Sequence, residues 1–358
     1  MGPEPGVPSE FHDSTEDPVA FVRLEPRPIP VVVERDDPDE VVRRTNHMFI
    51  GPDYSIVHPG IFPHNTEAQE LATIRQWLTF DHEAGWGTDD FEDSLADGYE
   101  FPEHWRSIDD RYDARDVVED NLALLAEADI ERLKILRAGY GLSEIEILKN
   151  GRKGIEFKLE VQNLTDGHGV PTGFDAERLV FLHTTVTDSE GTVIFESGDL
   201  DPNGDVRDLH SLYVHNGELP LDKQLFSLQS RFVTRMLRGG EREQVLAVNY
   251  SPSPLVFLRP SMTSTILTGR PLGVRKHKQN IDPLGHRVAR YRVKADRLTG
   301  KTPYRVKVEL IAGMIPVNLL TEIEVVGFDY FMSTREVAER VVAGHRVVRV
   351  REALIESP

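Results

Sequence analysis

The pattern of hydrophobic and polar positions changes near residue 142. From residue 45 to residue 141 apolar residues recur every three or four positions, which is the period of an amphipathic helix. One such stripe predicts a helix over residues 67–80, capped by Asn65 or Thr66, and a stronger one predicts a helix over 115–138 that Gly139 or Gly141 ends. We expect the acidic, aromatic-dotted stretch between them, residues 81–113, to be mostly loop.

After Leu142 the period becomes two, which is typical of β-strands with one buried face. In residues 155–161 the apolar side chains alternate with charged ones, and runs at 179–186 and 192–195 flank a turn at 188–191, which predicts a β-hairpin. Further strands are predicted at 145–147, 232–237, 244–250, 287–293 and 304–311. A last helix over 334–343 has Ser333 or Thr334 as its N-cap.

These periods together predict an α+β protein. An extended arm rich in proline and acidic residues covers residues 1–45, and its composition cannot bury enough apolar surface to fold alone. A helical region covers residues 46–141. The many short alternating strands of residues 142–358 indicate an antiparallel β-sandwich domain that ends in a short C-terminal helix.

Composition narrows the classes of partner and chemistry. The 358 residues carry a formal net charge of −19, which argues against nucleic acid and anionic membrane surfaces as partners. No apolar run approaches the roughly 20 residues of a membrane helix, so we expect no membrane insertion. The chain has no cysteine, which excludes disulfides, thiolate metal sites and covalent haem attachment through C-x-x-C-H. The first residues show no signal peptide, as in a mature or trimmed chain or one not exported alone.

The thirteen histidines are the main chemical resource. His47, His58 and His64 fall in one loop-rich segment, where imidazoles either hold a metal or an axial haem position or lie on the surface. His168 lies between glycines, which allow close approach of another group, so a ligand role and a turn-stabilising role are equally favoured. His183 lies inside an apolar strand and is interpreted as a hydrogen-bonded core histidine.

Other motifs are weaker. The sequence contains no G-x-S-x-G, H-E-x-x-H or P-loop motif, so a hydrolase is disfavoured. Asp201, Asn203 and Asp205 have the oxygen spacing of half a calcium loop, but no glutamate stands at its twelfth position. Calcium therefore stays open as a ligand of these three residues, on a weak signal.

Two segments carry a family resemblance. Residues 163–174 read NLTDGHGVPTGF, and residues 186–198 read VTDSEGTVIFESG. They resemble the post-haem region of bacterial multihaem c-type cytochromes, in which a GH-x-x-PTG loop opens a β-rich domain and a V-x-D-x-x-G-x-V-x-F-E-S-G hairpin follows. Further similar segments lie at 45–51, 121–128, 259–260, 269–271, 283–285, 316–319 and 327–333, so the resemblance covers about residues 45–345.

The resemblance implies electron transfer, with one large departure. Family members carry several C-x-x-C-H haem sites before this region, and this chain carries none, so it holds no haem covalently. The resemblance makes His47, in a segment similar to the family's S-H-x-F-x-G, the first candidate for a distal ligand to a partner's haem c. His58, His64 and His168 are the further candidates for this ligand.

We therefore expect a partner subunit of a multihaem cytochrome c complex, in the periplasm or outside the cell, with no catalytic activity of its own. It would supply scaffold, haem shielding and an axial histidine. The first rival is a stand-alone β-sandwich module that binds a polysaccharide or a protein; exposed aromatics clustered on one sheet face would favour it. The second is a hydrolase, which a carboxylate pair converging with a histidine in a closed pocket would favour.

Overall fold

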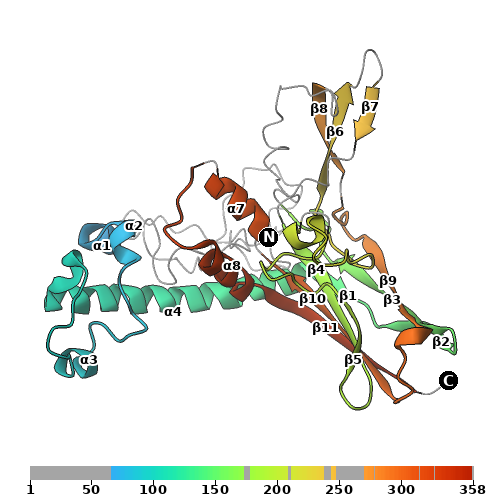
Figure 1. The fold of residues 1–358 in the computed structure, drawn as a ribbon, viewed down its shortest axis with the longest axis horizontal. Coiled ribbons are helices and arrows are strands. Elements are labelled where there is room, and N and C mark those ends of the chain that lie inside the picture. Colours follow the sequence, from blue (N-terminus) through green and yellow to red (C-terminus); the bar gives the residue numbers. More distant parts are fainter. Residues whose placement is uncertain are drawn as a thin grey trace, which may run out of the picture. The chain divides into compact units, whose positions relative to one another are not determined.

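The computed structural model describes residues 66–172, 178–208, 211–237, 243–246, 270–277, 279–313, 315–325 and 327–356 (Figure 1). Backbone contacts divide the chain into two compact units, Met1–Ile135 and Leu136–Pro358. The predicted arm over residues 1–45 lies outside the described residues, as do His47, His58 and His64. Within the described ranges, no helix has the length and apolar character needed to span a membrane.

The first unit begins with two short helices, α1 (Thr66–Leu71) and α2 (Ile74–Trp77). The prediction of one helix over residues 67–80 was wrong, because residues 72 and 73 interrupt the helix. The Thr73 side chain accepts a hydrogen bond from the Gln76 backbone N–H, and the Gln76 side chain accepts one from the Thr73 N–H at 2.8 Å. This capping box starts a new helix where the hydrophobic stripe alone predicted continuation.

The acidic, aromatic-dotted stretch is more ordered than predicted. It contains α3 (Asp89–Asp93), the 3₁₀ helix η1 (Glu103–Arg106) and the start of α4 (Ile108–Gly139), which begins earlier than the predicted helix over 115–138. Arg111 of α4 is almost fully buried, forms an ion pair with Glu92 and donates to the Trp105 carbonyl at 2.8 Å. Trp86 and Trp105 of this stretch join Trp77 and Phe80, which precede it, in a small apolar core with their aliphatic neighbours.

The second unit is built on two antiparallel sheets that share one core. In the first sheet, β3 (Gly154–Asn163) pairs on one edge with β1 (Tyr140–Leu142) and β2 (Glu146–Gly151), and on the other with β9 (His286–Lys294). The second sheet has the order β11 (Arg346–Ile355), β10 (Tyr304–Ala312), β4 (Val180–Thr187), β5 (Val193–Ser197). Side chains from both sheets form one apolar cluster, so the predicted α+β fold with a β-sandwich is confirmed.

The sequence predictions for the sandwich strands are largely confirmed. Ile155, Phe157, Leu159 and Val161 of β3 are buried, while the alternate residues are partly exposed. The β4–β5 hairpin forms with its turn at residues 188–191, where Gly191 has a φ of 83°. Strands β1 and β11 were not predicted, nor was the helix α7 (Val317–Val325).

Further elements complete the second unit. A third sheet has the order β7 (Glu243–Leu246), β6 (Arg231–Leu237), β8 (Arg270–His277). The short helices α5 (Leu212–His215) and η2 (Ala295–Arg297) lie in connections. Helix α8 (Thr334–Ala343) has the predicted bounds, and Ser333 caps it in a capping box with Glu336. The chain continues past this predicted last helix into β11.

Candidate functional site

The loop after β3 is folded around one buried amide. Asn163 is 2% exposed. Its Nδ2 donates to the carbonyl oxygens of His168 at 2.6 Å, Ile281 at 3.1 Å and Asp282 at 3.1 Å. Its Oδ1 accepts from the Thr165 backbone N–H at 2.9 Å. A neutral amide can donate and accept at once, so this one residue holds together two segments that are far apart in the sequence.

The tip of this loop faces solvent. Residues 166–168 are exposed, His168 among them, although the His168 carbonyl is held by Asn163 and by the Thr165 hydroxyl at 2.9 Å. Val170 and Ile281 exchange backbone hydrogen bonds of 2.9 and 2.8 Å, which fasten the far end of the loop. The structure therefore presents the His168 imidazole on an anchored backbone. The ligand role of His168 stays a prediction, and the exposed imidazole leaves room for it.

His183 is hydrogen-bonded as predicted, but it is not a core residue. It lies on the outer face of the second sheet and is half-buried. Its Nε2 lies 3.0 Å from Glu196 Oε1, and its Nδ1 lies 3.4 Å from Glu309 Oε2. The register places Glu309 directly opposite His183, because β4 and β10 are antiparallel neighbours. The prediction failed because His183 is surrounded in the sequence by apolar residues, which gave no sign that its side chain points outward.

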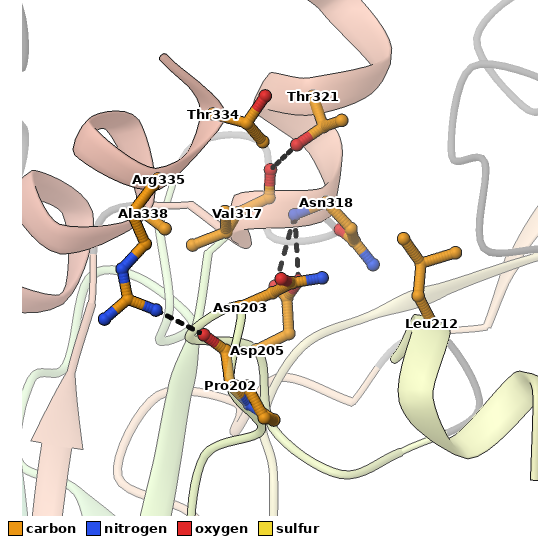
Figure 2. A pocket seen from close by; sticks show the side chains of 10 residues that line it. All are labelled: Pro202, Asn203, Asp205, Leu212, Val317, Asn318, Thr321, Thr334, Arg335 and Ala338. Atoms are coloured by element: carbon orange, nitrogen blue, oxygen red, sulfur yellow. Dashed lines mark hydrogen bonds between the residues drawn. The ribbon is translucent and has the colours of Figure 1, made fainter. Parts of the chain in front are cut away.

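A second candidate site is a cavity of about 280 Å³ beside the turn at residues 201–205 (Figure 2). Its walls come from that turn, from α5, and from α7 and α8. The turn closes with a hydrogen bond from the Gly204 N–H to the Asp201 carbonyl at 2.9 Å, and Gly204 has a φ of 89°. A Cβ at Gly204 would lie 2.6 Å from Val342 of α8, so only glycine lets the turn approach the helices this closely. The lining residues are Pro202, Asn203, Asp205, Leu212, Val317, Asn318, Thr321, Thr334, Arg335 and Ala338.

Two buried carboxylates hold the turn. Asp201 accepts from the backbone N–H groups of Asn203 at 2.8 Å and Asp205 at 3.1 Å, and from the Ser211 hydroxyl at 2.5 Å. Asp205 accepts from the Asn318 N–H at 3.0 Å, at the beginning of α7. It therefore caps α7 from a distant segment, where the helix N-terminus favours negative charge.

The environment of Asp205 favours its neutral form. Burial raises the pKa of Asp205 to about 8, and the nearby Asp201 and Asp208 charges act in the same direction. The hydrogen bond from Asn318 opposes these effects. The Arg335 guanidinium lies beside the cavity and donates to the Pro202 carbonyl at 3.2 Å (Figure 2). It also donates to Glu339 at 2.7 Å. The cavity thus presents amides, hydroxyls, one guanidinium and one carboxyl.

The calcium candidates Asp201, Asn203 and Asp205 do lie in one turn, but their arrangement is that of a hydrogen-bonded turn. Both Asp201 oxygens accept hydrogen bonds from protein groups, and Asp205 faces the backbone of α7. Within the described ranges, no group of three histidine or carboxylate side chains is placed to hold a metal ion. Calcium binding here stays a prediction.

Several residues of the cavity were missed by sequence reasoning. Asn318 and Thr321 belong to α7, a helix that the apolar sequence of residues 317–325 did not reveal. A local signal existed for Arg335, since it follows the predicted N-cap of α8. The anchoring role of Asn163 had no local signal, because Ile281 lies 118 positions away.

Comparison with known proteins gives one weak structural similarity. No protein-family model matches the chain, and no curated protein matches it significantly. Among solved structures it is similar to the crystal structure of a penta-heme cytochrome c552 from Thermochromatium tepidum, with a TM-score of 0.33 and 16% sequence identity. The similarity covers 62% of this chain and 41% of that chain. The chain is thus weakly similar in structure to part of a multihaem cytochrome.

Proposed function

We propose that this protein is a non-catalytic partner subunit of a multihaem cytochrome c electron-transfer complex, in the periplasm or outside the cell. In this proposal the β-sandwich is the scaffold, and the loop after β3 contacts the haem-bearing partner. The observation that carries the proposal is an exposed histidine on an anchored loop, in the segment that resembles the family. His168 is exposed, and its own carbonyl is held by the buried Asn163.

The residues of this chain fit a haem that another chain holds. The sequence has no cysteine, so a haem would come with its partner, where it carries one electron when bound. This chain would add one neutral imidazole to that group. An anchored backbone lowers the entropy lost when the side chain is ordered, which favours a loop like this one over a free tail. Of the four candidate histidines, His168 is the one within the described residues.

The binding-module alternative predicts exposed aromatics on one sheet face. Large exposed aromatic side chains among the described residues are Tyr99, Phe328 and Phe331, and all three lie in connections rather than in strands. The outward residues of β3 and β9 form ion pairs instead, as Glu156 does with Lys149 and Arg292. The described faces of the sandwich therefore lack the platform on which sugar rings stack.

The hydrolase alternative predicts two carboxylates and a histidine in a closed pocket. Among the described residues that line the cavity, Asp205 is the one carboxyl and no histidine occurs. The histidine that does meet two carboxylates, His183, lies on an outer sheet face. Neither place combines the groups with a closed pocket, so the non-catalytic function is favoured.

The test is to purify the native complex through this chain and record its absorption spectrum with a haem stain. We expect a Soret band, and c-type α and β bands, from a co-purifying polypeptide. In the complex, His168→Ala should change the haem spin state, whereas His215→Ala, an exposed histidine of α5, should not. A colourless product from the native host would overturn the proposal and favour the binding module.

A further inference from the structure

Strand β9 is strongly basic, although the chain as a whole is acidic. Its sequence HRVARYRVK contains four Lys or Arg residues and no acidic residue, while the chain has a net charge of −19. Its side chains alternate between the core, where Ala289, Tyr291 and Val293 are buried, and the solvent. The exposed face of the strand carries His286, Val288, Arg290, Arg292 and Lys294.

One edge of β9 has no strand beside it. Among the described strands, β9 pairs with β3 alone. On the other edge, Gln224 Oε1 accepts from the Arg292 N–H at 2.7 Å, and Gln224 Nε2 donates to the Arg292 carbonyl at 3.1 Å. These are the two bonds that a residue of an added strand would make. The Gln224 amide therefore shows that the backbone groups of Arg292 point away from β3.

The next two positions along this edge are open. Hydrogen-bonding groups of an antiparallel strand point alternately to its two sides, so Arg290 and Val288 also direct their N–H and carbonyl groups away from β3. No group of the described residues bonds to them on that side. Val288 is 40% exposed, and Arg290 is exposed as well. An exposed row of unpaired backbone groups is a template for another extended chain.

The cations beside this open edge are only partly neutralised. Arg292 lies 3.6 Å from Glu156, which is shared with Lys149 at 2.6 Å. Arg290 and Lys294 form no ion pair with any residue that the structure describes. Residues directly paired across two strands lie on the same face, so acidic side chains of an added strand would meet these cations.

We propose that the open edge of β9 binds an extended acidic segment of a protein partner by strand addition. The backbone of the segment would exchange hydrogen bonds with Val288 and Arg290, and acidic side chains at every second position would lie beside Arg290 and Arg292. A peptide is favoured over nucleic acid or anionic lipid, because phosphate oxygens accept hydrogen bonds but have no N–H for the carbonyls of the edge. This binding requires no haem, so its test is separate from that of the proposed cytochrome partner.

Two peptides separate strand addition from attraction between charges. The probe is a synthetic peptide of alternating glutamate and valine, and isothermal titration calorimetry measures its binding to the full chain at low and at high salt. The matched peptide has N-methylated glutamates. It keeps the same charge, but it loses the backbone N–H groups that would face β9.

Protein variants test the same contact from the other side. Val288→Pro removes an N–H that points away from β3, a position at which an edge strand tolerates proline, and Val288→Ala is its control. Arg290→Gln with Arg292→Gln removes two charges from the edge. Its control, Arg152→Gln with Lys153→Gln, removes two exposed charges from the turn between β2 and β3. Circular dichroism checks folding, and the methylated peptide tests the same hydrogen bonds if Val288→Pro does not fold.

We expect the wild-type protein and both controls to bind the probe alike. Methylation of the peptide and Val288→Pro should each weaken binding by about tenfold or more. Loss of the two arginine charges should weaken it by about fivefold at low salt and by less at high salt.

Three results would overturn the inference. Equal binding of the methylated peptide, or equal binding by Val288→Pro, would exclude strand addition, and equal binding by the two charge variants would exclude an acidic segment. Tighter binding of duplex DNA or phosphatidylserine vesicles than of the probe would indicate a phosphate-bearing ligand instead. A wild-type dimer that Val288→Pro dissociates in analytical ultracentrifugation would assign the edge to a second copy of the chain.

Discussion

The loop after β3 and the turn at residues 201–205 are both folded around a buried side chain of the Asx type. In the loop it is the amide of Asn163, which donates to carbonyls of two segments. In the turn it is the carboxylate of Asp201, which accepts from the N–H groups of the turn itself. The loop leaves its tip, with His168, in solvent, whereas the turn inserts its tip against α7 and α8.

The difference follows from hydrogen-bond chemistry. The oxygens of an aspartate side chain accept hydrogen bonds, so they gather N–H groups, which a tight turn and a helix N-terminus leave unsatisfied. An amide also donates, so it can hold carbonyl groups of a neighbouring segment and leave the rest of its loop free. Asp201 and Asp205, which we call the clamp, therefore hold the turn against α5 and α7, whereas Asn163 leaves the loop tip in solvent.

The largest effect is expected at the clamp. Asp201→Ala removes the acceptor of two backbone N–H groups and of the Ser211 hydroxyl, which is buried and also caps α5. Because those donors would be left unsatisfied in the interior, the free energy of unfolding should fall by ~3 kcal/mol. Chemical denaturation measures it. The exposed carboxylate Asp296 is the control, and its alanine variant should stay within ~0.5 kcal/mol of wild type. Equal losses would show that the Asp201 bonds contribute nothing specific.

Asn163→Ala should cost somewhat less, ~2 kcal/mol, because His168 and Asp282 are exposed and the buried Ile281 carbonyl still accepts from the Val170 N–H. Amide hydrogen exchange of the loop is the more specific measurement. Faster amide exchange is expected in residues 164–169, with no change in exchange of α7. Gln162→Ala, a partly exposed neighbour on the other face of β3, should leave both unchanged. Protection lost in α7 instead would contradict the separation of loop and clamp.

The clamp should also depend on pH, unlike the loop. The pKa of Asp205 is raised to about 8 in the folded protein, and unfolding restores its ordinary value of 3.8. The unfolded chain therefore binds fewer protons between these values, so stability falls as the pH rises through this window. His345 has its pKa lowered to about 4 by burial, and it acts in the opposite direction below about pH 6.5.

The range from pH 6.5 to 8 thus isolates Asp205 from His345. The free energy of unfolding should drop there by at least ~1 kcal/mol, and Asp205→Asn should flatten the curve. Thermal unfolding at a series of pH values would measure both. A wild-type curve that is level in this range would mean that the helix N-terminus keeps Asp205 ionised.

The elements that could be predicted from the sequence are those that local interactions determine. Strand β3, the β4–β5 hairpin and α8 were predicted because their periods, turn and cap are local. The break at Thr73 could also have been found, since Thr73 and Gln76 have capping-box spacing. Helix α7 could not, because Asp205, which caps it, lies 113 positions away, and its residues read like a buried strand.

The candidate site also has a part that the local sequence predicted and a part that it did not. His168 was found from its glycine-rich neighbours, but the anchor that makes its position meaningful required the fold, since Asn163 binds Ile281 across 118 positions. Residue types along a chain show which groups are available, and long-range pairing decides which of them meet.

The smallest effect on stability is expected at the loop tip. This prediction tests most directly whether the loop after β3 differs from the turn at residues 201–205. His168 is exposed, and the hydrogen bonds of its residue run through the backbone carbonyl, so His168→Ala should change the free energy of unfolding by less than ~0.5 kcal/mol. His183→Ala, which removes an imidazole between Glu196 and Glu309, should cost more, ~1 kcal/mol. Chemical denaturation of the two variants gives the order. If His168→Ala proved the more costly, the imidazole would have a structural role. That result would contradict both the difference between loop and turn and the proposed ligand role of His168.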